Sequence, residues 1–280
     1  VDGAAGGRAR VPRALGRRGP GGAGRAVSAA TAGLGTQDLH VHTTMSDGKL
    51  TLDEVVGLSR ERGVRVGIAD HVSSRQKAFI PAERVPAYLD ALDGADVFRA
   101  GEFCWADTLW HTLPDEVMAR FDYRIGSNHG FWMPDGRVYS PWWPVLHPEF
   151  DVRPDQLMDI MVANLCDLVR TMPIQIAGHS TFLPAGLRRL EDDALAWWTE
   201  EREDRYVEAL AESGVALEIS SRYRLPHHRL LRKAREAGVR FSLGSDGHGE
   251  EQVARLEWAV EAAQRAGVTD ADLFVPERRA

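Results

Sequence analysis

Short apolar runs alternate with segments of helical hydrophobic spacing along most of the chain. The first helical segment begins at Thr51, whose spacing to Glu54 fits a capping box, and it is expected to end at Gly63. Two later helical segments are expected to end at Gly214 and Gly238, and an apolar strand pattern follows each glycine. Because strands and helices alternate, the pattern predicts a mainly parallel sheet with helices outside it.

Seven segments have the apolar pattern and the length of strands. They are residues 38–41, 64–69, 97–100, 123–126, 174–177, 215–219 and 239–244. Seven strands are too many for a small sandwich, and they suit a closed or nearly closed barrel. An open doubly wound sheet is the alternative, but no glycine-rich nucleotide-binding loop follows the first strand. The sequence therefore predicts an α/β fold, with a barrel preferred over the open sheet.

The beginning of the chain differs in composition from the rest. Residues 1–36 are rich in Gly, Ala and Arg, show no sustained hydrophobic period, and contain six arginines but one aspartate. We expect a disordered extension here, because the segment lacks both the apolar core of a secretory signal and the amphipathic face of a transit peptide. Residues 37–280 then make up the folded domain.

Composition excludes several classes of function for this domain. Of the 280 residues, 44% are hydrophobic and 27% charged, which is ordinary for a globular protein. No apolar run approaches the roughly 18 residues that a membrane span needs, so no membrane partner is expected. The net charge is −7 although the first 36 residues are basic, and such an acidic domain argues against binding of long nucleic acids. The two cysteines form no C-x-x-C pair, so a reducing cytoplasm is the expected compartment.

Most predicted strands end in a side chain that can bind a metal ion. In chain order, these candidate ligands are His40, His42, Asp47, His71, Glu102, His129, His179, Asp246 and His248. Because the carboxyl ends of parallel strands meet on one face of a barrel, residues distant in sequence are expected to converge in one pocket. So many ionisable groups in a solvent-poor pocket would carry a large desolvation cost without metal ions, so the set predicts a metal site.

The spacing of His40 and His42 has a direct structural rationale. Residues two apart on a strand point to the same side, so both imidazoles can face one ion. Asp246 and His248 have the same spacing, which serves the same purpose if the chain stays extended there. Glu102 has two carboxylate oxygens and can bridge two ions. Imidazole and carboxylate ligands together favour zinc, manganese or iron over calcium, and we expect two or three such divalent ions.

Two further features stand near these candidate ligands. Cys104 lies two residues after Glu102, and we expect a buried, inert thiol there. Aromatic segments at residues 131–133 and 142–143 follow His129. They are predicted either to form a lid or wall of the substrate pocket or to pack over the end of the barrel.

The candidate ligands stand in short motifs whose order resembles that of a known family. The motifs are Asp38-Leu39-His40-Val41-His42-Thr43 with Ser46-Asp47-Gly48, Ala69-Asp70-His71, Gly101-Glu102, Asp122-Tyr123-Arg124-Ile125-Gly126-Ser127-Asn128-His129, Gly178-His179, Leu217-Glu218-Ile219 and Leu243-Gly244-Ser245-Asp246-Gly247-His248. Together they resemble the PHP (polymerase and histidinol phosphatase) superfamily over about residues 37–265. Each motif is short, but the combination and its order are specific.

The resemblance implies a distorted TIM-like (β/α)7 barrel with a centre of three metal ions. The implied ligands are His40, His42, Glu102 and Asp246 for the first ion, Glu102, His129 and His179 for the second, and Asp47, His71 and His248 for the third. Some relatives have histidine where this chain has Asp47. The large polymerase regions are missing, so the resemblance implies a stand-alone enzyme whose C-terminal half is most similar to histidinol-phosphatase-type members.

The expected function is hydrolysis of a small phosphate monoester, histidinol-phosphate-like or another phosphorylated metabolite, by a water that the metal ions activate. The candidate catalytic residues are Glu102, Asp246 and His248. Arginine is the natural additional phosphate ligand, because its guanidinium matches the geometry of a phosphate group. The candidates for this role are Arg222, which follows the sixth predicted strand, and more weakly Arg75 and Arg137.

Three alternatives stay open on the sequence. The first is a nucleotide phosphatase or short-oligonucleotide nuclease of the same superfamily, since an acidic domain argues only against long nucleic acids. The second is an amidohydrolase-type enzyme that cleaves a C–N bond. Such enzymes also open with H-x-H, but they usually bridge their metals with a modified lysine where this chain has Glu102. The third is a non-catalytic metal-binding module, which a metal-dependent turnover assay would separate from an enzyme.

Overall fold

The computed structural model describes residues 33–277, which belong to one compact unit. The extension expected at residues 1–36 lies outside the described residues except for its last four. The α-helices of the described part are α1 (Leu52–Arg62), α2 (Val85–Leu92), α3 (Asp115–Met118), α4 (Pro154–Thr171), α5 (Ala185–Arg188), α6 (Ala194–Trp197), α7 (Glu200–Ser213), α8 (His228–Glu236) and α9 (Glu257–Arg265). Short 3₁₀ helices cover Ala82–Arg84, Leu109–His111, Pro148–Phe150 and Asp270–Asp272.

Every strand predicted from the sequence is confirmed, with ends that differ by at most two residues. The strands in question are β1 (Gln37–Val41), β2 (Arg65–Ile68), β4 (Phe98–Arg99), β6 (Ile125–Ser127), β9 (Ile176–Gly178), β10 (Ala216–Ser220) and β11 (Phe241–Gly244). Two short strands that the sequence pattern did not separate are β3 (His71–Val72) and β5 (Glu102–Cys104). They follow β2 and β4 after short breaks, and each begins with a candidate metal ligand.

The strands form parallel sheets, as the alternation of strands and helices predicts. β1 pairs with β2 and β2 with β4 in one sheet, while a second sheet has the order β11-β10-β9-β6-β5-β3. A parallel bridge between Val41 and Gly247 joins the end of β1 to the segment after β11. The exception is an antiparallel hairpin of β7 (Phe131–Trp132) and β8 (Val138–Tyr139). The described chain is therefore a mixed α/β structure with parallel sheets.

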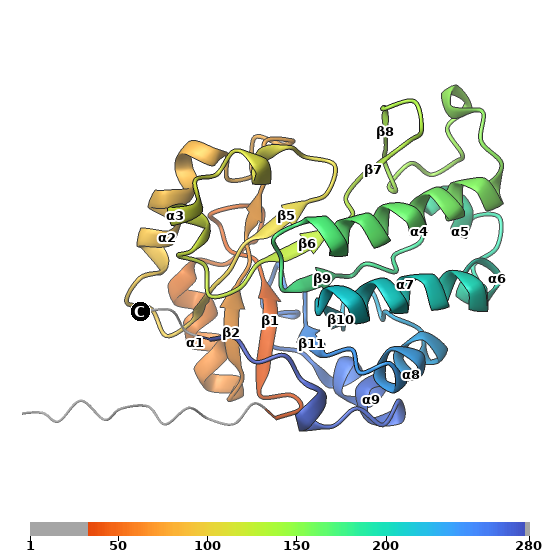
Figure 1. Cartoon of the computed structure of the whole chain (residues 1–280). Helices are drawn as coiled ribbons and strands as arrows, with labels where there is room; N and C mark the ends of the chain where they lie inside the picture. Colours follow the sequence, from red (N-terminus) through yellow and green to blue (C-terminus); the bar gives the residue numbers. More distant parts are fainter. Residues whose placement is uncertain (1–32, 278–280) are drawn as a thin grey trace, which may run out of the picture. The chain divides into compact units, whose positions relative to one another are not determined.

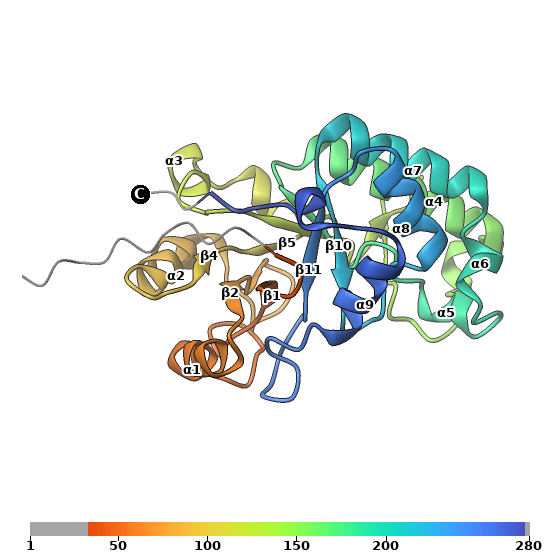
Figure 2. The same ribbon diagram turned by 90° about the horizontal axis from the view of Figure 1, so that it is seen from below.

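Helices flank the strands in both views of the molecule (Figure 1 and Figure 2). α4 and α7 lie side by side, α7 also contacts α8, and α9 contacts β10 and β11. On the other side of the strands, α1 packs against β2. None of the helices within residues 33–277 combines the length and the hydrophobicity that a membrane crossing requires.

Local capping signals set the ends of the predicted helices. The Thr51 hydroxyl accepts a hydrogen bond from the backbone N–H of Glu54, and the Glu54 carboxylate accepts one from the backbone N–H of Thr51. This capping box begins α1, and Gly63 ends the helix with a φ of 65°, in the left-handed region that glycine tolerates. Gly214 ends α7 in the same way, and Gly238 follows α8 with a φ of 77°. The strands β2, β10 and β11 therefore begin shortly after these three glycines, as predicted.

A buried tyrosine, Tyr123, forms a hydrogen bond with the backbone of strand β1 in the core. The Tyr123 hydroxyl donates a hydrogen bond of 2.7 Å to the carbonyl of Leu39, which lies on β1. The ring reaches this carbonyl only because Gly67, on β2, has no side chain, since a Cβ at that position would lie 1.8 Å from the hydroxyl. Close approach of an aromatic ring to backbone is thus the reason for glycine at this position.

We expect Gly67→Ala to lower the free energy of unfolding, because the new Cβ forces the Tyr123 ring away from Leu39. Overpacking of this kind costs about 1–3 kcal/mol. Gly57→Ala is the matched control, because Gly57 lies within α1 with open space around it and the change should stabilise the helix by about 0.5–1 kcal/mol. Urea denaturation of the two variants measures the difference, and equal stabilities would contradict this account of the core.

Candidate metal centre

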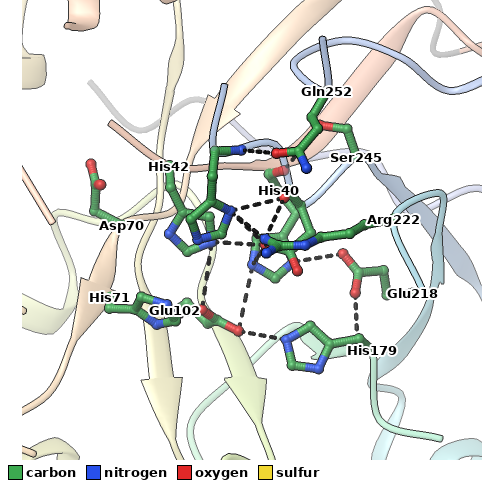
Figure 3. Close-up of polar contacts among 12 residues, drawn as sticks. His40, His42, Asp70, His71, Glu102, His179, Glu218, Arg222, Ser245 and Gln252 are labelled. Atoms are coloured by element: carbon green, nitrogen blue, oxygen red, sulfur yellow. Dashed lines mark hydrogen bonds and ion pairs between the residues drawn. The ribbon is translucent and has the colours of Figure 1, made fainter. Parts of the chain in front are cut away.

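The structure brings all nine candidate ligands together. Their ligand atoms form four overlapping groups, and within each group all atoms lie within 4.8 Å of one another. The groups are His42, Asp47, His71 and His248; His40, Glu102 and His179; His40, His42 and Asp246; and His71, Glu102 and His129. Figure 3 shows several of these side chains pointing toward one another from different strands.

Glu102, the first residue of β5, faces both histidines of the H-x-H pair. Its Oε1 lies 3.5 Å from Nε2 of His40, and its Oε2 lies 3.7 Å from Nε2 of His42. Asp246 approaches the same two imidazoles, with its Oδ1 3.2 Å from Nε2 of His42 and 3.9 Å from Nε2 of His40. Two carboxylates and two imidazoles therefore surround one small volume, and this is the set that the resemblance implies for the first ion.

The same glutamate contacts three further imidazoles. Its Oε1 lies 3.3 Å from Nε2 of His129 and 3.0 Å from Nε2 of His179. Its Oε2 lies 2.7 Å from Nδ1 of His71. Glu102 is fully buried, so its charge interacts with these rings without screening by solvent. Because its two oxygens face different imidazoles, the carboxylate has the geometry of a bridge between neighbouring ions.

A third group of ligands surrounds Asp47, in the loop between β1 and α1. One carboxylate oxygen of Asp47 lies 3.6 Å from Nε2 of His71, and the other lies 3.4 Å from Nε2 of His248. Nδ1 of His42 lies 3.8 Å from Asp47. The Asp47 side chain is 35% exposed, whereas the carboxylates of Glu102 and Asp246 are buried. The third group is therefore the one that lies nearest to solvent.

Strand alternation accounts for His40 and His42, but it does not account for Asp246 and His248. Asp246 has a φ of 48°, in the left-handed region, so the chain turns at this residue. The condition under which the spacing of these two residues would direct both side chains to one ion, an extended chain, is therefore not met. The turn directs Asp246 to the histidines of β1 and directs His248 to Asp47 instead. Such backbone strain in a residue other than glycine is common at functional sites.

Glu218, to which the sequence reasoning assigned no role, holds two of the ligands in place. One of its carboxylate oxygens lies 2.7 Å from Nδ1 of His40, and the other accepts a hydrogen bond from the backbone N–H of His179. The bond at Nδ1 leaves Nε2 of His40 free to face Glu102. The sequence did contain a signal for this role, because Glu218 is a charged residue in the middle of the wholly buried strand β10.

Two buried aspartates shape the loops that carry ligands. Asp70 accepts hydrogen bonds of 2.8 and 2.7 Å from the backbone N–H and the hydroxyl of Thr43, at the start of the loop that presents Asp47. Asp38 accepts one of 2.8 Å from the backbone N–H of Ser245, beside the last two ligands. Burial raises the pKa of each of these carboxyls to about 6, against the opposing effect of the hydrogen bonds. Through their hydrogen bonds, Asp70 and Asp38 position the segments that carry Asp47 and Asp246, although neither aspartate belongs to a ligand group.

The imidazoles of β1 carry buried nitrogen atoms that are not used within the protein. Among the described residues, Nε2 of His40 and both ring nitrogens of His42 are buried and have no hydrogen-bond partner. Burial, and then the neighbouring His71, lower the pKa of His42 to about 3, so its ring is neutral and its lone pair is available. Buried polar atoms without partners are costly, and a metal ion is the partner that neutral imidazoles take most readily.

Two of the imidazoles, those of His129 and His40, show a raised pKa. Burial alone would lower the pKa of His129, but Glu102 and Cys104 outweigh it and raise that pKa to about 10. The pKa of His40 also lies well above its usual value despite burial, chiefly because of Glu218 and Glu102. Both shifts show that the buried carboxylates require positive charge close by. Divalent cations fit this requirement, and their binding would displace the protons.

A cavity of about 440 Å³ opens onto the ligands. The ligands that line it are Asp47, His71, His129, His179, Asp246 and His248. Its other walls include the side chains of Arg75, Arg222, Phe79, Trp142 and Tyr223. Cys104 also lines this cavity and is a buried free thiol, as predicted.

The three candidate arginines differ in their relation to this cavity. Arg222 points toward the histidines of β1 (Figure 3). Its Nη1 lies 3.6 Å from Oδ1 of Asp246. Arg75 lines the cavity, and its Nη1 donates a hydrogen bond of 3.0 Å to the carbonyl of Ala106. The structure does not bring Arg137 to the cavity, because its guanidinium binds Asp135 across the tight turn of the β7–β8 hairpin.

Aromatic rings form a continuous wall from the surface to the metal ligands. Trp142, whose exposure is 47%, lies with its ring centre 4.7 Å from that of Phe182. Phe182 lies 5.2 Å from Tyr223, which lies 5.3 Å from the imidazole of His179. By contrast, Phe131 is fully buried and packs on another ring of the core. Of the two aromatic segments, the later one thus lines the cavity and the earlier one packs inside.

Comparison with known proteins adds no relative to this description. No protein-family model matches the chain, and no curated protein matches it. The resemblance to the PHP superfamily therefore stays a prediction from the motifs and their order along the chain.

Glu218→Gln is expected to weaken metal binding by about 10- to 100-fold, because the amide loses the negative charge that holds Nδ1 of His40. The matched control is Glu236→Gln at the exposed end of α8, where the carboxylate pairs only with Arg232. Equilibrium dialysis against Mn²⁺ measures the affinities. Binding by Glu218→Gln that equals the control would remove Glu218 from the centre.

Metal binding is expected to release protons at pH 7, because the pKa of His129 is about 10 and the carboxylates around His40 outweigh burial and raise its pKa as well. Release should fall as the pH rises through about 10, where His129 loses its proton in the metal-free protein. Isothermal titration calorimetry in buffers of different ionisation enthalpy counts the protons. Binding without proton release at pH 7 would contradict these charge assignments.

Proposed function

We propose that the chain is a metal-dependent hydrolase of the PHP type that cleaves small phosphate monoesters. The observation that carries this proposal is the arrangement of imidazoles and carboxylates around Glu102, together with the unpaired buried nitrogens of His40 and His42. Catalysis, and not metal binding alone, is favoured because other members of the ligand groups, such as His129 and Asp246, line an open cavity that a substrate can enter. The ligand order and spacing along the chain are those of the superfamily's motifs.

The fold that we propose for this function is a distorted TIM-like barrel of seven β/α units. Parallel pairings run from β1 to β2 and β4, and from β3 through β5, β6, β9 and β10 to β11. The bridge between Val41 and Gly247 supports closure, because it joins the ends of β1 and β11. In such a barrel the carboxyl ends of all strands meet at one rim, which agrees with the convergence of the ligands.

The donor set suits zinc, manganese or iron. Six imidazoles and three carboxylates are a mixture that these ions accept and that calcium does not favour. His40, His42, Glu102 and Asp246 would hold one ion, Glu102 with His129 and His179 a second, and Asp47 with His71 and His248 a third. Bound divalent ions supply acidification of water and neutralisation of phosphoryl charge.

The residues of the chain have separate tasks around the phosphoryl group. Glu102 and Asp246 hold the centre in a fixed geometry, because both carboxylates are buried among imidazoles. Arg222 stands at the edge of the cavity, where its guanidinium can bind phosphoryl oxygens with directed hydrogen bonds. His248 and Asp47 lie at the exposed side of the centre and would orient the ester oxygen that leaves. Arg75 also lines the cavity and is the weaker candidate for binding phosphoryl oxygens.

A nucleotide phosphatase or short-oligonucleotide nuclease is the second candidate. The wall of Trp142, Phe182 and Tyr223 favours it, because nucleobases stack on aromatic side chains. The amidohydrolase alternative has less support. The chain has three lysines, Lys49, Lys77 and Lys233, and none of them lines the cavity. We propose a small phosphorylated substrate in a reducing cytoplasm, in keeping with two free buried cysteines.

Phosphate release in the presence of Mn²⁺ or Zn²⁺ tests this proposal, with histidinol phosphate and mononucleotides among the substrates. Glu102→Gln and His40→Ala are expected to lower kcat/KM by more than about 100-fold, because each removes a ligand of the proposed ions. His228→Ala, at the exposed start of α8, is the matched control and should retain full activity. Circular dichroism verifies folding. Unchanged activity in both ligand variants, or no metal-dependent turnover in the natural protein, would refute the proposal.

A further inference from the structure

Arg222 forms a hydrogen bond with His248, a candidate metal ligand, and this hydrogen bond cannot coexist with a metal ion on that histidine. Its Nη1 lies 2.6 Å from Nδ1 of His248 and donates a hydrogen bond of 3.1 Å to the carbonyl of Asp246. Nδ1 of His248 also lies 3.0 Å from that same carbonyl. One backbone oxygen is thus within reach of both a guanidinium N–H and an imidazole nitrogen.

The hydrogen atoms on these groups determine which contacts can coexist. A guanidinium is always protonated and only donates, so at 2.6 Å it requires a free lone pair on Nδ1 of His248. The neutral ring then carries its hydrogen on Nε2, where it points to Asp47 at 3.4 Å. A nitrogen that carries a hydrogen cannot bind a metal ion. In this arrangement His248 is therefore withdrawn from the third group of ligands.

Metal binding through Nε2 requires the other arrangement of hydrogens. The hydrogen then lies on Nδ1 and is donated to the carbonyl of Asp246, 3.0 Å away. Two N–H groups, from Arg222 and His248, would face each other at 2.6 Å, and the guanidinium would also stand beside a divalent cation. Both effects are repulsive, and a ring protonated on both nitrogens would face the same N–H conflict. The guanidinium must leave before the ion is held.

We propose that Arg222 and a divalent ion at the group formed by His42, Asp47, His71 and His248 exclude one another. This inference rests on the proposed metal centre and adds a regulatory role for Arg222 to it. When the ion binds, the guanidinium is released toward the cavity that it already lines. The chain can accommodate this movement, because the Arg222 side chain is 32% exposed, its contact with the Asp246 carboxylate is a long 3.6 Å, and its guanidinium lies 5.3 Å from the face of Tyr223. Binding of an ion at this group thereby determines whether Arg222 is free to bind an anion in the cavity.

Isothermal titration of the metal-free full-length chain with Mn²⁺ tests the coupling without any assay of activity. Arg222→Met keeps the length of the side chain but removes its charge and donors. This variant should bind the ion at the group that contains Asp47 and His248 about 5- to 150-fold more tightly. The ion held by Asp246, whose carboxylate lies 3.6 Å from Nη1 of Arg222, should be affected less. Arg222→Gln is a second variant with the same expectation. Arg232→Met, an exposed arginine on α8 paired with Glu236, controls for the loss of one positive charge.

Asp47→Asn identifies the ion concerned, because it should weaken that ion alone. Equal affinities of Arg222→Met, Arg222→Gln and Arg232→Met for every ion would overturn the inference while leaving the metal centre intact. A tightening that falls mainly on an ion insensitive to Asp47→Asn would overturn it as well. Failure of the natural protein to bind any Mn²⁺ would refute the proposed function itself, and the inference with it.

Discussion

The charge of one buried carboxylate governs the arrangement of the whole centre. Glu102 lies within 3.7 Å of five imidazoles, contributed by His40, His42, His71, His129 and His179, and has almost no exposure to solvent. An isolated buried carboxylate costs several kcal/mol, so positive charge must be held beside it. Protonated imidazoles or metal cations can supply that charge. Only a metal cation would also bind a buried nitrogen of His42, whose ring nitrogens have no hydrogen-bond partner among the described residues.

The fold meets this electrostatic demand by delivering the rings at the ends of parallel strands. β1, β6, β9 and β11 each place a ligand at or just beyond their carboxyl ends, and the short strands β3 and β5 begin with one. Residues outside the group keep the rings oriented, and Glu218 is the strongest example because it binds both His40 and the backbone at His179. The ligands therefore lie either on strands or in the short segments that directly follow them, and Asp47 is the one farthest from its strand.

Sequence reasoning recovers the features whose cause is local. The capping box at Thr51 and the glycine at Gly63 set the ends of α1 through neighbours three or four residues away, so both ends are predictable. The breaks that separate β3 and β5 from the preceding strands leave no comparable signal. Alternation of side chains on β1 likewise predicts that His40 and His42 share a face.

Features whose cause is distant escape such reasoning. Glu218 meets His40 across 178 positions of sequence; its charge within the buried strand β10 indicates a role, but nothing near either residue indicates that His40 is its partner. The left-handed conformation of Asp246 has no local signal in the sequence, so the spacing of Asp246 and His248 does not predict where their side chains point. Arg137 is suggested by its chemistry alone, but a partner two residues away, Asp135, holds its guanidinium on the exposed hairpin. The candidate metal-ligating residues are thus far easier to predict from the sequence than the residues that hold them in position.

Anomalous diffraction from crystals of the protein grown with Mn²⁺, recorded on both sides of the manganese absorption edge, tests the central claim most directly. The account predicts at least two manganese positions that share Glu102, one of them bound by Nε2 of His40 and His42 and another by His129 and His179. Manganese bound elsewhere, or a Glu102 carboxylate that contacts no ion while these histidines do, would contradict it.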